Sequence, residues 1–122
     1  MYAATIPVFF GALVRPTIER AAQLADGVVL VSVDWDETRT KIGWYRNAGG
    51  TGTVVVNTIP TYPGGKVTAP AFTGAVLADL DRAAAVGADE MCISLNLVTP
   101  VPPDRQRELL GALAAELGLD QT

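Results

Sequence analysis

The fold of this chain is indicated most clearly by residues 28–37, which read Val-Val-Leu-Val-Ser-Val-Asp-Trp-Asp-Glu. The first six residues are mostly β-branched and too few for a buried helix, so they predict a buried strand. Asp34 is followed three residues later by Glu37, which predicts a helix start in the form of a capping box. The stretch therefore predicts one strand–helix unit.

Three further apolar runs repeat this arrangement along the chain. The predicted strands are Ile6–Phe10, Val28–Val33, Thr53–Ile59 and Met91–Leu97. The predicted helices are Pro16–Ala25, Asp34–Asn47, Thr73–Val86 and Pro103–Leu117, and the third has an inward face of Val76, Leu77, Leu80 and Ala84. Such alternation predicts parallel βαβ units. We expect one α/β domain over residues 1–122, made of four consecutive parallel βα units that amount to half of a (βα)8 TIM barrel.

A half-barrel has two unpaired edges, here the first and the last predicted strand. Exposed apolar strand edges favour pairing with another chain. We therefore expect a homo-oligomer, most simply a two-fold homodimer. The other possible partner is a separate polypeptide that supplies the N-terminal half-barrel.

Composition excludes several classes of function. The chain is 49% hydrophobic and 18% charged, with a net charge of −4 and no basic stripe, so neither nucleic acid nor an anionic membrane is an expected partner. No apolar run approaches the roughly 18 residues of a membrane span. Histidine is absent, which removes the commonest general base and metal ligand, and we expect no metal site. Cys92 is the lone cysteine and is expected to be a buried strand residue. Without an intrachain disulfide the chain suits the cytoplasm.

Candidate binding residues follow from the rule that ligands of parallel βα folds bind at the carboxyl ends of the strands. A turn of small residues before a helix N-terminus offers N–H groups to a phosphate, although a glycine there also serves packing alone. Near the ends of the third and fourth strands, an asparagine either binds a ligand or holds loop backbone. The candidates are Gly11, Ala12, Leu13, Asn57 and Asn96.

A short internal repeat lies before the second and fourth predicted strands. Arg20–Leu24 reads Arg-Ala-Ala-Gln-Leu and Arg82–Val86 reads Arg-Ala-Ala-Ala-Val, and each leads through small residues and an aspartate into a strand. Shared helix-to-strand geometry accounts for the repeat, because alanine allows close packing on a sheet.

These segments resemble the luciferase-like monooxygenase superfamily. Residues 6–12, Ile-Pro-Val-Phe-Phe-Gly-Ala, and residues 20–27, Arg-Ala-Ala-Gln-Leu-Ala-Asp-Gly, resemble its strand ending in Gly-Gly and its following helix and turn. Residues 34–36, 48–52 and 80–90 resemble its branch that uses the deazaflavin coenzyme F420. The resemblance runs from about Thr5 to Leu117 and covers only the C-terminal half of the family's barrel.

The resemblance implies an oxidoreductase that transfers hydride at F420 or FMN bound at the barrel mouth, acting on a small-molecule substrate. It places Gly11 and Ala12 against the cofactor phosphate. Ala12 stands where the family has a second glycine, and Val14 where it often has a phosphate-binding serine. No catalytic residue is carried over, because most ring and substrate contacts come from the N-terminal half. The alternative is a non-catalytic, degenerate half-barrel that dimerises and binds a phosphorylated small molecule or no ligand.

Overall fold

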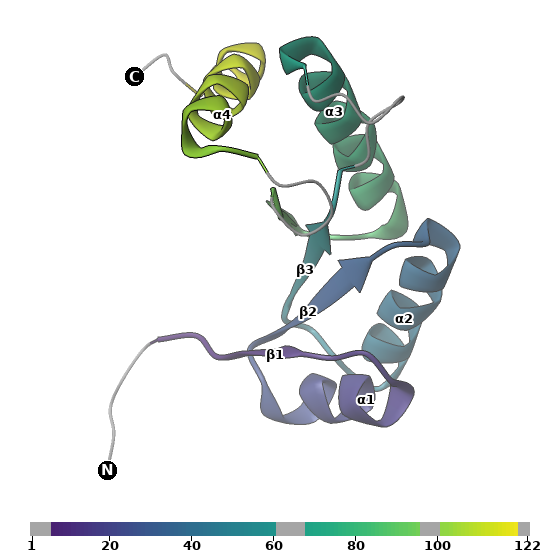
Figure 1. Ribbon diagram of the computed structural model, residues 1–122. Helices are drawn as coiled ribbons and strands as arrows, with labels where there is room; N and C mark the ends of the chain where they lie inside the picture. The colour runs from purple at the N-terminus through teal and green to yellow at the C-terminus, as the bar shows by residue number, and fades with distance from the viewer. Residues whose placement is uncertain (1–5, 61–67, 96–100, 120–122) are drawn as a thin grey trace.

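A computed structural model describes residues 6–60, 68–95 and 101–119, and there strands and helices alternate (Figure 1). The elements are β1 (Phe9–Gly11), α1 (Arg15–Leu24), β2 (Gly27–Ser32), α2 (Trp35–Asn47), β3 (Thr53–Thr58), α3 (Ala69–Val86), β4 (Glu90–Ile93) and α4 (Pro103–Leu117). The four strands are parallel and form one sheet in the order β1-β2-β3-β4. The predicted α/β class and the parallel βα units are therefore confirmed.

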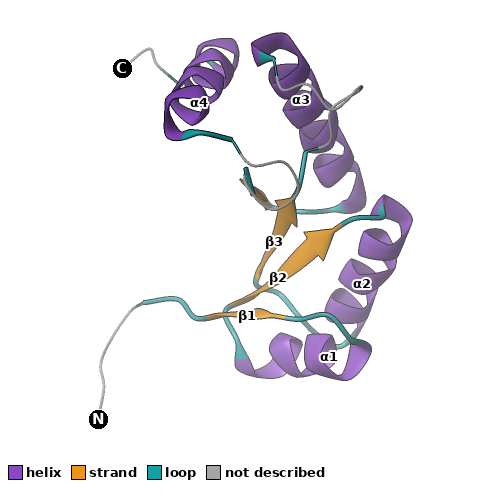
Figure 2. Ribbon diagram, viewed as in Figure 1, coloured by secondary structure: helices purple, strands orange, loops and turns teal. Residues whose placement is uncertain are grey.

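The helices α1, α2 and α3 lie on the same face of the sheet (Figure 2). This follows from the strand order, because right-handed connections between consecutive parallel neighbours place every crossover helix on one side. The helix-facing side chains of β2 and β3 are buried in one apolar core with Ile18, Ile42 and Tyr45 of the helices; they are Val28, Leu30, Val54 and Val56.

The opposite face of the sheet is covered by no helix or strand among the described residues (Figure 2). We call it the open face, made by the alternate residues Phe9, Val29, Val31, Val55, Asn57 and Cys92. Val55 at its centre is buried, but Val31 is 39% exposed and Val33, just past the end of β2, is 85% exposed. Apolar side chains are thus left in contact with water along β2.

A second apolar cluster joins α3 to α4. Phe72 and Val76 of α3 are buried with Leu109 and Leu113 of α4, and Val101 closes the cluster. Spacings of four residues place each pair on one face of its helix. The predicted stripe of α4 is confirmed at its two buried leucines, while Leu110 and Leu117 are 45% and 38% exposed.

The predicted inward face of α3 is confirmed at Val76 but wrong at Leu80 and Ala84. The buried positions are Phe72, Val76, Ala83 and Val86, whereas Leu80 is 39% exposed and Ala84 is exposed. The buried positions continue a helical period through Asp79, whose side chain is only 14% exposed. The helix also begins at Ala69 and not at Thr73, because the Thr68 hydroxyl accepts a hydrogen bond from the Ala71 N–H at 3.2 Å and so caps it.

Three predictions about strands are also corrected. Strand β1 begins at Phe9 and not at Ile6, because its neighbour β2 begins at Gly27, opposite Phe9. Cys92 is exposed and not buried, because it pairs with Asn57 in register and shares the open face. Strand β4 covers Glu90–Ile93, so the predicted extension is wrong at Ser94 and Leu95, and its last two residues lie outside the described residues.

The internal repeat has a structural role. Before β2, Asp26 accepts a hydrogen bond from the Val8 N–H at 2.7 Å and donates its own N–H to the Val8 carbonyl at 2.8 Å. Before β4, Asp89 makes the same two bonds with Val54, both at 2.9 Å. Each aspartate therefore binds the preceding strand of its βαβ unit, and Asp89 also pairs with Arg46 at 3.1 Å.

No helix in the described ranges combines the length and the apolar composition that a membrane crossing requires.

Replacing Asp89 by alanine should destabilise the protein. The N–H of fully buried Val54 loses its acceptor, and an unpaired buried donor costs about 1 to 2 kcal/mol. Urea unfolding followed by circular dichroism measures the change. D81A is the control, because Asp81 is exposed and makes no hydrogen bond or ion pair seen in the described residues. Equal stability of D89A and D81A would contradict the role given to Asp89.

The free energy of unfolding should depend on the ionisation of Asp79. Burial raises the pKa of this carboxyl, and Arg82, at 3.5 Å, only partly opposes the shift. A raised folded-state pKa means that Asp79 favours folding most below its unfolded-state pKa and less as the pH rises through the folded-state value. D79N should therefore gain stability relative to the parent chain at pH 7 but not at pH 3, in urea titrations at the two values. An equal effect at both values would contradict it.

Candidate functional site

The carboxyl ends of the four strands meet at one edge of the sheet, because the strands are parallel. Gly11, Ala12 and Leu13 connect β1 to α1 at this edge, and Asn57 lies near the end of the next strand but one. The predicted residues are thus brought to the same edge of the sheet, with the exception of Asn96, which lies outside the described residues. Leu13 is 67% exposed and Ala12 is buried.

The start of α1 is the best anion site at this edge. Its N-cap residue Val14 makes no side-chain hydrogen bond to the helix, and the first turn holds no acidic residue. By contrast, Asp34 caps α2 and accepts from the N–H groups of Asp36 and Glu37 at 2.9 and 3.1 Å. Thr68 caps α3, and α4 carries Asp104 in its first turn. Among the described helices, α1 alone therefore begins with neither a capping side chain nor a carboxylate to offset its partial positive charge.

Gly11 has no packing function among the residues that the structure describes. A Cβ atom placed on it would meet no heavy atom within 4 Å, and its backbone does not have a positive φ angle. Gly27 differs, since a Cβ there would lie 2.4 Å from the Thr53 carbonyl oxygen. The absence of a side chain at Gly11 therefore leaves space that a molecule from outside this chain can occupy.

Not every N–H of the turn is available to a ligand. The Ala12 N–H donates to the Val29 carbonyl at 3.2 Å and so belongs to the sheet. Backbone groups of successive strand residues point to opposite sides, so the N–H of Gly11 points away from β2. The donors that remain are those of Gly11, Leu13 and the first turn of α1, where Pro16 contributes none.

Asn57 is held by a residue that the sequence reasoning missed. The Ser94 hydroxyl donates to Asn57 Oδ1 at 2.9 Å, and no other hydrogen bond of the Asn57 side chain is seen in the described part of the chain. Its amide NH2 group is thus oriented as a donor on the open face. The strand register identifies Ser94. It lies two residues after Cys92, the register partner of Asn57, and therefore on the same face of the sheet.

A shallow cleft of about 160 Å³ adjoins Leu13 at this edge. Its apolar wall is Val31 and Val33, and its polar wall is the first turns of α2, where Lys41 pairs with Glu37 at 3.0 Å. Below it, the buried hydroxyls of Ser32 and Thr38 are 2.9 Å apart. Thr38 and Lys41 were not among the predicted site residues, because both lie inside a helix, and the rule for parallel folds selects residues at the strand ends.

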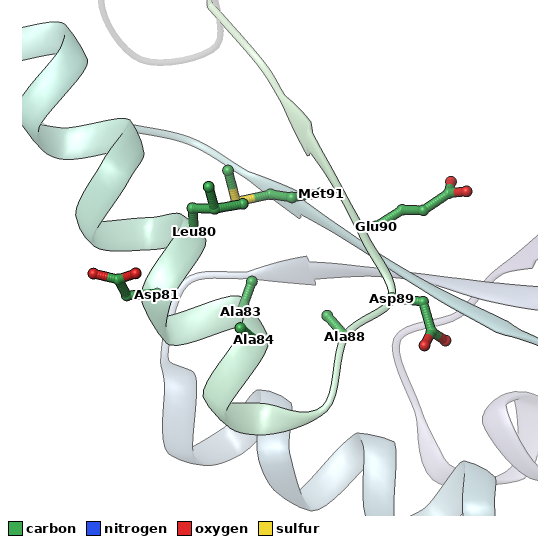
Figure 3. A pocket seen from close by; sticks show the side chains of 8 residues that line it. All are labelled: Leu80, Asp81, Ala83, Ala84, Ala88, Asp89, Glu90 and Met91. Atoms are coloured by element: carbon green, nitrogen blue, oxygen red, sulfur yellow. The ribbon is translucent and has the colours of Figure 1, made fainter. Parts of the chain in front are cut away.

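A larger depression, of about 200 Å³, lies at the opposite edge, where α3 turns into β4 (Figure 3). Small side chains of Ala83, Ala84 and Ala88 create the space. Its charged lining residues are Asp81, Asp89 and Glu90, and these carboxylates disfavour a phosphate. Within the described residues no group of three or more cysteine, aspartate or glutamate side chains is placed to hold a metal ion. The carboxyl edge is therefore the candidate site.

Comparison with known proteins does not add a relative: no family model, no curated protein and no solved structure matches this chain.

Proposed function

We propose that this chain is the C-terminal half of a (βα)8 oxidoreductase barrel of the luciferase-like type, and that it binds the phosphate side of F420 or FMN. The start of α1, free of capping side chains and of acidic residues, is the observation that carries the proposal. It follows an exposed glycine turn at the carboxyl edge of a parallel sheet. The strand order β1-β2-β3-β4, with the crossover helices on one face, supports the barrel geometry.

The residues present fit a phosphate better than they fit a reactive ring. The N–H groups of Leu13 and the first turn of α1 would hold the phosphate, and the side-chain-free Gly11 would leave space beside it. Asn57, oriented by Ser94, would donate to a polar edge of the cofactor. The cofactor itself supplies hydride transfer, while this chain binds and orients it.

The second candidate is a non-catalytic half-barrel that binds a phosphorylated small molecule. Two observations favour it. The Ala12 N–H is already used in the sheet, and the nearby carboxylates in the described residues are occupied, since Asp34 caps α2, Glu37 pairs with Lys41 and Glu19 pairs with Arg15. Such a module would bind inorganic phosphate or a sugar phosphate as well as it binds FMN.

Two substitutions at Val14 test the phosphate site. Val14 is 58% exposed at the N-cap of α1, so serine or aspartate there should cap the helix and raise stability by about 1 kcal/mol. V14S caps the helix without adding a charge, so it is the matched control and should change the binding of FMN or F420 much less than V14D does. V14D places a carboxylate on the anion site and should weaken binding about tenfold or more, the equivalent of 1.4 kcal/mol.

Binding is measured by the change in absorbance or fluorescence of the added cofactor. Because both variants are expected to stabilise the fold, a loss of binding in V14D alone cannot come from unfolding. If neither cofactor binds the parent chain or V14S, the oxidoreductase proposal is wrong. Equal competition by inorganic phosphate would favour the non-catalytic module.

A further inference from the structure

We infer that a second copy of this chain completes the sheet, with β4 of each copy pairing in parallel with residues 6–11 of the other. The two pairings are related by a two-fold axis, and the two open faces enclose a common interior. This inference takes only the half-barrel geometry from the proposed function and does not depend on a cofactor.

The described residues leave apolar surface that a second copy would cover. On the open face Val31 and Val33 are 39% and 85% exposed, although both belong to a continuous apolar run. The strands of a parallel sheet are normally buried on both faces.

The edge at β1 shows where part of that surface lies. Ile6 and Val8 are 71% and 57% exposed, although they belong to an apolar run that predicts a strand. The Val8 N–H and carbonyl both bond to Asp26, so this segment is already extended along the start of β2. By alternation, the backbone groups of Phe9 and Gly11 point toward the unpaired side. The segment thus offers donors and acceptors to a neighbouring parallel strand.

The register of the sheet indicates which residues would meet. One row across it runs through Gly11, Val29, Val55 and Glu90. An eight-stranded barrel with a shear of eight shifts such a row by about four residues over each half. Glu90 would therefore face either Pro7 or Arg15 of the second copy. Arg15 begins α1, so the extended segment at Pro7 is the partner, and Cys92 then faces Phe9.

A second copy is favoured over other occupants because one chain carries both complementary edges. Pairing β4 with residues 6–11 twice leaves no edge strand unpaired, which a closed two-fold assembly requires. The units β1-α1-β2 and β3-α3-β4 also share the same aspartate hydrogen bonds, made by Asp26 and Asp89. One chain therefore already contains two copies of the structural unit that an eight-stranded barrel would repeat.

Cross-linking tests this arrangement. F9C adds a cysteine to a chain whose native Cys92 lies three strands away, or roughly 14 Å at the usual strand spacing. A disulfide needs Cα atoms within about 7 Å, so the pair cannot close within one chain. Under mild oxidation we expect F9C to form a covalent dimer on non-reducing gels. The yield should be about tenfold or more above that of the control L24C, because pairing holds the two thiols at high effective concentration. Leu24 is 69% exposed on α1 and belongs to neither of the strands that would pair.

A second cysteine pair keeps the test valid if F9C fails to fold, because Phe9 packs over Gly27 and its loss removes that contact. P7C/E90C in a C92S background places both thiols at exposed positions and should give the same dimer. The parent chain should sediment at twice 12.8 kDa. A monomer at tens of micromolar, or cross-linking no better than L24C, would overturn the inference, as would a complex only with a different polypeptide. A dimer that binds no cofactor would leave this inference intact and count against the proposed function alone.

Discussion

The structure depends on one constraint, which is that strands following one another in a parallel sheet place all their crossover helices on the same side. Parallel sheets in stable domains are covered on both faces, and strands in them read as continuous apolar runs. Here β2 is such a run, yet only its Val28 and Leu30 side is packed against helices. Its other side, Val29 and Val31, has the composition of a buried face without a covering element among the described residues. The sequence of β2 is thus suited to burial on both faces, whereas the described part of one copy packs helices against only one.

The class and order of the elements were predictable from the sequence, because the strands are predominantly apolar runs and each helix has a clear start or stop. Asp34 does cap α2, and Gly87 does end α3 in the left-handed conformation. Helix rotation was less predictable. In α3 the leucines at positions 77 and 80 suggested one face, whereas packing against α4 and β4 selected the stripe that contains Asp79. A sequence shows which residues are apolar, but the neighbours decide which of them are buried.

Only the location of the candidate site, at the carboxyl edge of the sheet, was predictable from the sequence. The rule for parallel folds predicted that the turn after β1 and Asn57 lie at one edge of the sheet, where the structure has them, but Ser94 and Lys41 required the register and the packing of α2. The exposure of Cys92 shows the limit most clearly. In a strand buried on both faces a cysteine reads as a core residue, and only the strand order reveals that one of those faces lacks a cover.

The polar residues of the open face argue for a barrel interior over a second layer of helices. Asn57, Ser94 and Glu90 lie on this face or at its ends, and Figure 3 shows Glu90 pointing away from α3. A helix packed across the sheet would strip water from these groups, and each one left unpaired would cost about 1–3 kcal/mol. At the mouth and the base of a barrel, the same groups remain hydrated while Val29 and Val55 between them are enclosed. The open face thus has an apolar centre and hydrated polar residues at its two ends, which is the pattern that a closed barrel of parallel strands requires.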